Sequence, residues 1–161
     1  SEYTLRDKVS SCYGYGLTMS AIQIAQAYSV FANEGVFKEL TLFIDDQISS
    51  NLIEERVISS ETASIVRGML IKTVNTSTGT ARNAKIKGIV VAGKTGTAIE
   101  NSENLSYTAT FAGFAPAMDP ELLVVIALHG LQGEDYSGGK VAAPIFSQIV
   151  GQSLHVLKAG N

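Results

Sequence analysis

The sequence predicts an α+β fold in which helices from both ends of the chain cover an antiparallel sheet. Three strand-like runs follow one another in the second half, and the short links between them favour an antiparallel meander over crossover units. Stretches with apolar residues three and four positions apart, the spacing of an amphipathic helix, precede and follow these runs. The 161 residues are 45% hydrophobic and 17% charged, with a mean hydropathy of +0.18, which excludes a disordered chain.

A first helix is expected to begin at Thr18 or Ser20 and to run to about Asn33. A hydroxyl at either starting position can cap the helix, and Gly35 tolerates the left-handed conformation that ends helices. Residues 37–48 then have the character of an irregular extended segment or a hairpin. The expected buried stripe of this helix consists of Ile22, Ala25, Tyr28 (or Ser29) and Ala32.

A second helix is expected to start near Ser59 or Ser60 and to end around residues 73–75. Glu61 is favourably placed in its first turn, because the N-terminal end of the helix dipole attracts negative charge. The expected apolar face consists of Ile65, Val66, Met69, Leu70 and Val74.

The three predicted strands are Gly88–Ala98, Tyr107–Phe114 and Leu122–Leu128. The third is apolar at every position, which predicts that both of its faces are covered. The polar residues 100–106 between the first two strands are expected to form an exposed connection. A last helix is expected to begin near Pro144, since proline suits the first helical position.

The charge balance excludes several classes of partner. Twelve Lys and Arg against 15 Asp and Glu give a net charge of −3, and no basic cluster is present, so binding to a nucleic-acid backbone is not expected. The longest apolar run, Leu122–Leu128, is far shorter than the about 20 residues that span a bilayer. The opening residues also lack the apolar region of a signal peptide.

Metal and disulfide chemistry are not expected either. The single cysteine, Cys12, excludes an internal disulfide and a cysteine-rich zinc site. His129 and His155 have no spacing that resembles a zinc motif, so they are expected to be surface or edge residues. No metal site is therefore expected from these residues.

The most informative stretch surrounds Lys94. Gly88 through Thr95 formally matches the phosphate-loop pattern G-x-x-x-x-G-K-[ST]. A phosphate loop needs flexible residues inside and a helix directly after, because the helix N-terminus binds the phosphate. Here the interior residues 89–92 are strand-like, and no apolar helical stripe follows Thr95. The nucleotide-binding interpretation is therefore rejected.

The alternative places Lys94-Thr95-Gly96 on the strand itself, with Lys94 supplying a positive charge for an anionic substrate terminus. The hydroxyls of Thr95 and Thr97 can bind a carboxylate, and the Thr97 backbone N–H can stabilise an oxyanion. Gly96 has no Cβ, so a substrate backbone can lie close to the strand. K-T-G is one of three motifs of penicillin-binding proteins and class A β-lactamases. An ordinary lysine at a strand edge is the competing interpretation.

Several further segments agree, in order, with one of these families. From about Gly14 to Leu154 the chain resembles the C-terminal part of the transpeptidase domain of a class B penicillin-binding protein. The Gly14-Tyr15-Gly16 form is more similar to the cell-division, septal type than to the elongation type. The segments that carry the resemblance are 14–17, 20–28, 32–35, 56–59, 79–81, 111–116 and 138–146.

The resemblance implies peptidoglycan D,D-transpeptidation by a serine acyl-enzyme, with no cofactor, on the periplasmic side of the bacterial inner membrane. It implies that Lys94 tunes electrostatics and proton transfer, that Thr95 and Thr97 hold the substrate carboxylate, and that the Thr97 N–H stabilises the oxyanion. Tyr136 would lie near the active-site end of the Lys94 strand, where it is a candidate substrate contact. The implied ligands and partners are the peptidoglycan stem peptide, β-lactam antibiotics and, for the parent, division proteins.

The family also carries a nucleophilic serine in S-x-x-K and a second motif, S-x-N. Ser49-Ser50-Asn51 matches S-x-N but follows the Gly14-Tyr15-Gly16 segment, whereas the family's motif precedes it. Ser137-Gly138-Gly139-Lys140 matches S-x-x-K but follows Lys94, and its two glycines are expected to spoil the helical turn that the motif needs. Both stretches are therefore interpreted as surface loops.

Residues 1–161 are accordingly expected to be the C-terminal portion of a transpeptidase domain, without the half that carries S-x-x-K and S-x-N. The chain alone is expected to be catalytically incompetent, with the missing N-terminal half as a partner. Two alternatives stay open, a non-catalytic peptide-binding or division-complex scaffold module and a serine β-lactamase-like hydrolase.

Overall fold

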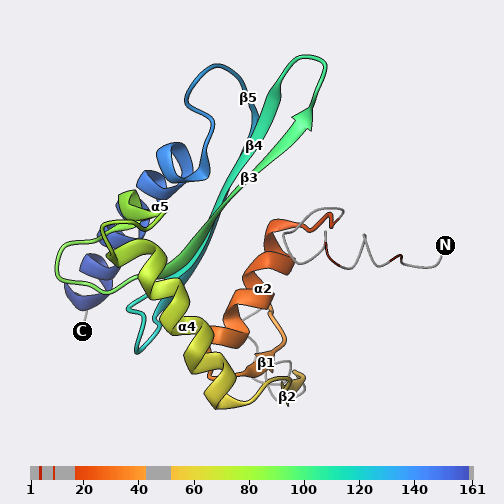
Figure 1. Ribbon diagram of the computed structural model, residues 1–161. Coiled ribbons are helices and arrows are strands. Elements are labelled where there is room, and N and C mark those ends of the chain that lie inside the picture. Colours follow the sequence, from red (N-terminus) through yellow and green to blue (C-terminus); the bar gives the residue numbers. More distant parts are fainter. Residues whose placement is uncertain (1–3, 5–8, 10–16, 43–51, 160–161) are drawn as a thin grey trace.

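The computed structural model describes residues 4, 9, 17–42 and 52–159 of the chain (Figure 1). Predictions that concern Cys12, Gly14-Tyr15-Gly16 and Ser49-Ser50-Asn51 lie outside these residues. The elements are α2 (Ala21–Ala32), β1 (Val36–Lys38), β2 (Glu54–Arg56), α4 (Ser60–Asn75), the short 3-10 helix η1 (Arg82–Ala84), β3 (Ala92–Asn101), β4 (Ser106–Ala115), β5 (Leu122–Leu131) and α5 (Gly138–Ala159).

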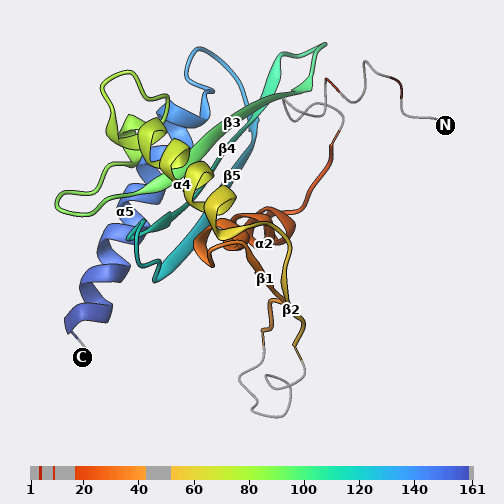
Figure 2. The same ribbon diagram turned by 60° about the horizontal axis from the view of Figure 1, so that its bottom comes forward.

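Strands β3, β4 and β5 form an antiparallel sheet in that order, which confirms the predicted meander and the α+β class. Figures 1 and 2 show α5 on one side of this sheet and α2 and α4 on the other. Phe111 on β4 packs edge-on against Phe146 of α5, with ring centroids 4.6 Å apart. Phe114, which faces the opposite side of β4, belongs to a second cluster with Leu70 of α4 and Phe31 of α2.

Strand β5 contacts both clusters, but its residues are half-buried or exposed, so the predicted covering of both faces is only partial among the described residues. Leu122, Val124 and Ile126 pack with the α5 cluster, whereas Leu123 packs with the cluster of α2 and α4. The strand extends to Leu131, three residues beyond the predicted end, because the antiparallel register with β4 continues past an irregularity.

The predicted first helix is confirmed as α2, and Ser20 is its N-cap. The Ser20 side chain accepts a hydrogen bond from the backbone N–H of Gln23, whose own side chain accepts from the Ser20 N–H. Of the expected extended segment 37–48 only Phe37 and Lys38 lie in a described strand, β1, which pairs antiparallel with Glu54–Arg56. Figure 2 shows this two-stranded arm projecting away from the main sheet.

The second helix is also confirmed, with Ser59 as the N-cap of α4, but part of its predicted apolar face is wrong. Ile65 and Met69 are 55% and 59% exposed. The helix instead buries a stripe with helical spacing toward α2 and the sheet, which leaves Ile65 and Met69 on the outer side. The buried residues are Ala63, Arg67, Leu70 and Val74.

Strand β3 begins later and ends later than predicted. Gly88 lies in a tight turn with φ of +78°, where Ile86 and Ile89 form an isolated antiparallel bridge, so the predicted start is wrong. At its other end β3 continues to Asn101, so Glu100 belongs to the strand and not to a connecting loop. The short helix η1 was not predicted.

Helix α5 begins at Gly138 and contains Pro144 in its interior, so the predicted start at Pro144 is wrong. The expectation that the two glycines spoil a helical turn is also wrong, because the turn forms and packs directly on the sheet. A Cβ on Gly138 would lie 2.6 Å from the Gly96 carbonyl oxygen and closer still to that of Thr110. Glycine lets the helix approach the strands this closely, and that packing outweighs its unfavourable helix propensity of about 1 kcal/mol.

Candidate functional site

Strand β3 lies at one edge of the sheet, and α4 covers only the first part of that edge. The side chain of Thr73 donates a hydrogen bond to the Gly93 carbonyl, and Asn75 Nδ2 donates to the Val91 carbonyl at 2.8 Å. Alternate residues of an antiparallel strand present their peptide groups to the same edge. The peptide groups of the odd-numbered residues of β3 therefore face outward, and those that follow Gly93 are not covered by α4.

Lys94 lies at the point where this cover ends. Its Nζ donates to the Thr95 carbonyl at 2.9 Å and lies 3.5 Å from the Thr95 hydroxyl. The next outward-facing peptide group is that of Thr97. Lys94, Thr95, Gly96 and Thr97 thus lie on one stretch of strand edge that α4, among the described elements, does not cover.

The side chains of this stretch alternate between the two faces of the sheet. Lys94 and Gly96 lie on the α2 side, while Thr95 and Thr97 point toward η1 and α5. The Thr95 hydroxyl lies 3.3 Å from that of Thr80, and the Thr97 hydroxyl accepts a hydrogen bond from the Gly138 N–H at 3.1 Å. Because Thr97 Oγ1 accepts in this contact, its own proton stays available to donate to a ligand.

Gly96 has a packing role that the sequence did not indicate. A Cβ at this position would collide with the hydroxyl of Thr110, the residue opposite on β4. The predicted close approach of a substrate backbone stays a prediction, and the cross-strand contact is a second physical reason for glycine here.

Two adjoining cavities of about 200 and 330 Å³ lie between α2 and the sheet, next to Lys94. We call the pair the Lys94 groove. Lys94, Tyr28 and Val125 line the first cavity, and Met19, Ala98 and Thr108 are among those lining the second. The two cavities share Ile24, Gly96 and Thr110.

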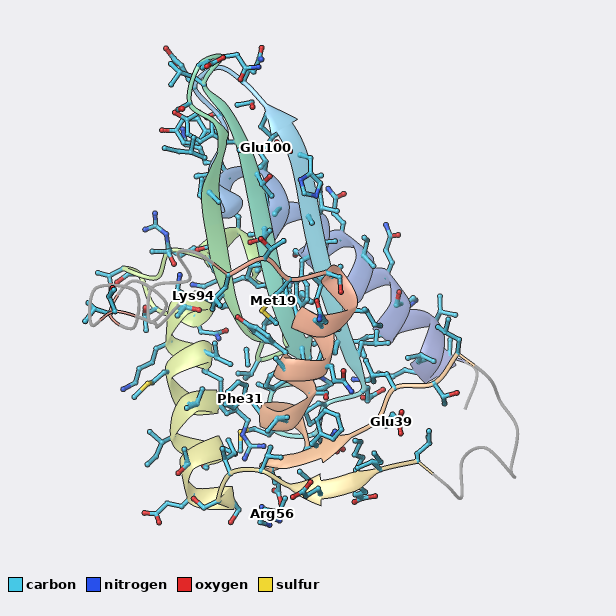
Figure 3. All side chains as sticks on the ribbon, turned by 90° about the vertical axis from the view of Figure 1, so that its right-hand side faces the viewer. Met19, Phe31, Glu39, Arg56, Lys94 and Glu100 are labelled. Carbon is cyan, nitrogen blue, oxygen red and sulfur yellow. The ribbon has the colours of Figure 1, made fainter. Side chains whose placement is uncertain are left out.

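Lys94 therefore lies beside a groove, as its predicted role requires. Burial raises the pKa of the Tyr28 hydroxyl, which keeps this neighbouring group protonated and neutral. Figure 3 shows Lys94 and Met19 on the sheet face over which α2 lies.

Tyr136 lies apart from the lining of the Lys94 groove. Its ring stacks on that of Tyr107, with centroids 3.8 Å apart and an angle of 11° between the planes. Tyr107 is on β4, where it pairs with Ile99, so the stack holds the segment before α5 against the far half of the sheet. The predicted substrate contact of Tyr136 stays a prediction.

The S-x-x-K match in the α5 turn has a different environment from that of a catalytic pair. Lys140 Nζ lies 2.6 Å from Asp135 Oδ1, and this carboxylate raises the pKa of the Lys140 ammonium. An ion pair with a carboxylate at an exposed site is an ordinary surface interaction, and nothing in it favours Ser137 as the nucleophile.

Sequence reasoning missed the polar residues that hold β3 and α5 in place. These residues are Thr73, Asn75, Thr80 and Asn83, and Asn83 Nδ2 donates to the Gly139 carbonyl at 2.8 Å. Their residue types are those of ordinary loops and helix ends, so composition alone could not identify them.

The described residues include neither a metal-binding cluster nor a membrane-crossing helix. Within ranges 17–42 and 52–159 and residues 4 and 9, no three His, Cys, Asp or Glu side chains cluster as metal ligands would. In that same part of the chain, no helix combines the length and the apolar character that crossing a membrane requires.

Comparison with protein families matches residues 3–151 to the penicillin binding protein transpeptidase domain. The chain is 38% identical, over 92% of its length, to a probable peptidoglycan D,D-transpeptidase, PbpC, of Pseudomonas aeruginosa, of which it covers 26%. It is 33% identical, over 94% of its length, to the peptidoglycan D,D-transpeptidase FtsI of Buchnera aphidicola, of which it covers 27%. The chain thus spans about a quarter of these relatives.

Solved structures show the same similarity. The apo transpeptidase domain of penicillin-binding protein 3 from Burkholderia pseudomallei matches with a TM-score of 0.81 and 34% identity, covering 94% of this chain and 46% of that one. The transpeptidase domain of the D,D-transpeptidase FtsI4 from Legionella pneumophila matches with a TM-score of 0.67 and 31% identity, covering 84% and 47%.

Proposed function

Since the chain belongs to the transpeptidase domain family of class B penicillin-binding proteins, we propose that it forms the substrate-holding part of a peptidoglycan D,D-transpeptidase. The observation that carries the proposal is the edge of β3 from Lys94 to Thr97, which α4 leaves open among the described elements and which lies beside the Lys94 groove. Membership of this family would place the chain on the periplasmic side of the inner membrane. The FtsI relatives favour a role in division.

An extended stem peptide ending in D-Ala-D-Ala would pair with this edge as an added strand. The outward N–H and C=O of Thr97 supply the main-chain hydrogen bonds, as in other cases of strand addition. The hydroxyls of Thr95 and Thr97 receive the terminal carboxylate, and the ammonium of Lys94 adds a charge-assisted interaction. To reach the ligand, Lys94 Nζ leaves the Thr95 carbonyl that it contacts here.

The proposed reaction is acyl transfer in two steps. A serine oxygen attacks the carbonyl between the two D-Ala residues, the peptide bond breaks, and the terminal D-Ala leaves with the serine proton on its amine. The amine of a neighbouring stem then attacks the acyl-enzyme ester, which restores the serine hydroxyl. In both steps the Thr97 N–H stabilises the oxyanion, and the positive charge of Lys94 favours the deprotonated serine.

The serine is expected in a part of the domain that these 161 residues do not contain. The chain covers 46% of the solved Burkholderia pseudomallei domain, which leaves more than half of such a domain to supply S-x-x-K and S-x-N. We therefore propose that the isolated chain binds no β-lactam covalently and that the complete domain does.

Labelling with a fluorescent penicillin tests both statements. The full-length protein should be labelled stoichiometrically, and the isolated 161-residue chain should not. In the full-length protein, Lys94→Ala should slow acylation about 100-fold or more, because an electrostatic contribution to the transition state is lost. Lys87→Ala, which removes an exposed lysine before β3, is the matched control and should be acylated at the normal rate.

The same labelling distinguishes the alternatives. A full-length protein that is never labelled would be a peptide-binding scaffold, and one that is labelled and then rapidly deacylated would be a β-lactamase-like hydrolase. Normal acylation of Lys94→Ala would show that the role given to this lysine is wrong.

A further inference from the structure

Thr80 reaches the candidate site from the side of η1 and α5. It lies in the turn between α4 and η1, and its hydroxyl oxygen is 3.3 Å from that of Thr95. Among the described residues, the Thr80 hydroxyl has no other hydrogen-bond partner. No second acceptor in that part of the chain therefore competes with Thr95 for the proton of Thr80.

The backbone holds Thr80 beside the strand. The N–H of Ala81, a completely buried residue, donates to the Thr73 carbonyl of α4 at 3.0 Å. A Cβ on Gly139 would collide with the Thr80 carbonyl oxygen, so the turn packs directly against the first turn of α5 (Figure 1). Asn83, just after the turn, donates to the Gly139 carbonyl at 2.8 Å. Contacts with both helices thus fix the backbone that carries the Thr80 hydroxyl.

The direction of the contact between the two hydroxyls depends on what Thr95 binds. A threonine hydroxyl has one proton to donate and two lone pairs that accept. A carboxylate can only accept, so Thr95 must give its single proton to such a ligand. It then has no proton left for Thr80. The contact is therefore kept in the bound state only if Thr80 donates and Thr95 accepts.

Thr97 has the same arrangement with a different donor. The Gly138 N–H donates to Thr97 Oγ1 at 3.1 Å, so each of the two hydroxyls proposed to bind the carboxylate has a donor behind it. A backbone N–H can only donate, whereas the Thr80 hydroxyl can donate or accept. A hydroxyl that accepts a hydrogen bond is also the stronger donor, because the bonds of a chain polarise one another.

We propose that Thr80 is a positioning residue for the substrate carboxylate: its hydroxyl donates to Thr95 Oγ1 and so directs the Thr95 proton to the ligand. This inference rests on the proposed function, because that function places the carboxylate at Thr95 and Thr97. Thr80 acts through Thr95 and does not itself touch the ligand. Its contribution is therefore made to ligands that carry a carboxylate and is absent for neutral ones.

A penicillin and its methyl ester provide the test, because the two compounds differ in the carboxylate alone. The full-length protein is incubated with either compound for increasing times, and fluorescent penicillin then labels the sites that are left. The loss of label gives an acylation rate constant for each compound. The readout is the ratio of the constant for the acid to the constant for the ester. Comparing this ratio between variants cancels the different intrinsic reactivities of the two compounds.

Thr80→Val keeps the shape of the side chain and removes the hydroxyl. It should lower the ratio about three- to tenfold, the usual contribution of one hydrogen bond, while the constant for the ester changes by less than about twofold. Thr80→Ser, which retains a hydroxyl, should keep the ratio of the unaltered protein. The matched control is Thr78→Val in the same turn. The Thr78 hydroxyl is exposed and bonds to no described residue, so its removal should leave the ratio unchanged.

A second comparison tests whether Thr80 acts through Thr95. In a Thr95→Val background, Thr80→Val should change the ratio by less than about twofold, because the hydroxyl that it supports is already gone. A full effect of Thr80→Val in that background would overturn the inference.

The remaining outcomes also decide the matter. A ratio that is unchanged in Thr80→Val, that Thr80→Ser also lowers, or that falls equally in Thr78→Val would overturn the inference. An equal fall for acid and ester in Thr80→Val would overturn it too, because Thr80 would then support the shape of the site and not the recognition of a carboxylate. So would equal acylation by acid and ester in the unaltered protein. Failure of the unaltered protein to label with penicillin would overturn the proposed function instead.

Discussion

The two faces of the β3–β4–β5 sheet are built differently. On the α5 face, Phe111, Phe146 and Val150 are completely buried, and the strands and the helix interdigitate. On the α2 face, the helix leaves two cavities against the strands, and Ile22 and Met19 remain 56% and 46% exposed. The α5 face therefore stabilises the fold, whereas the α2 face leaves space for a ligand or for further protein.

The largest expected effect concerns the α5 face of the sheet. Phe146→Ala should lower the free energy of unfolding by about 3–5 kcal/mol, because it removes a fully buried ring that packs on Phe111. Chemical denaturation of the variant measures this. Met19→Ala, on the α2 face, should change the free energy of unfolding by less than about 1 kcal/mol. Equal losses at the two sites would show that the faces do not differ in packing.

The next effect concerns the junction between α5 and the strand edge. Gly138→Ala should lower the free energy of unfolding by about 1–3 kcal/mol, because the new Cβ would meet the carbonyls of Gly96 and Thr110. The shift of α5 would also move the Gly138 N–H away from Thr97, so penicillin acylation of the full-length protein should fall.

Gly151→Ala, in the same helix, is the matched control. Its Cβ would meet only Ile86 Cγ2 at 3.6 Å, an ordinary contact. This variant should be stabilised by about 0.5–1 kcal/mol, because alanine is the better helix former, and its acylation should be unchanged. Loss of stability in both variants alike would refute the close-approach role of Gly138.

The smallest expected effect on stability concerns the α2 face of the sheet. Ser20→Ala should lower the free energy of unfolding by about 1 kcal/mol, because it removes the side chain that caps α2. Ser20→Asp, which retains a capping oxygen, should restore the stability, and thermal unfolding of the pair decides the point. An unchanged melting temperature in Ser20→Ala would mean that packing alone holds α2 against the sheet.

The starts of α2 and α4 and the order of the strands could be predicted because they depend on neighbouring residues. Ser20 and Ser59 bond backbone N–H groups within their own first turns, so the capping signal is contained in a few consecutive residues. The meander could be predicted for the same reason. Its links are too short for the crossover that parallel strands need, so consecutive strands pair antiparallel. The K-T-G tripeptide likewise indicated the strand edge on which the candidate site lies.

Other features depend on groups far apart in the chain, and no local pattern contains them. The buried side of α4 follows from the surfaces it meets, so Ile65 and Met69 lie outward despite their hydrophobicity. The Thr97 hydroxyl meets the Gly138 N–H across 41 positions of sequence, and Glu100 meets Gly130 across 30. Propensity and periodicity depend on residues that are close together in sequence. These contacts form only when the strands and helices pack, because packing decides which atoms from distant parts of the chain come within reach.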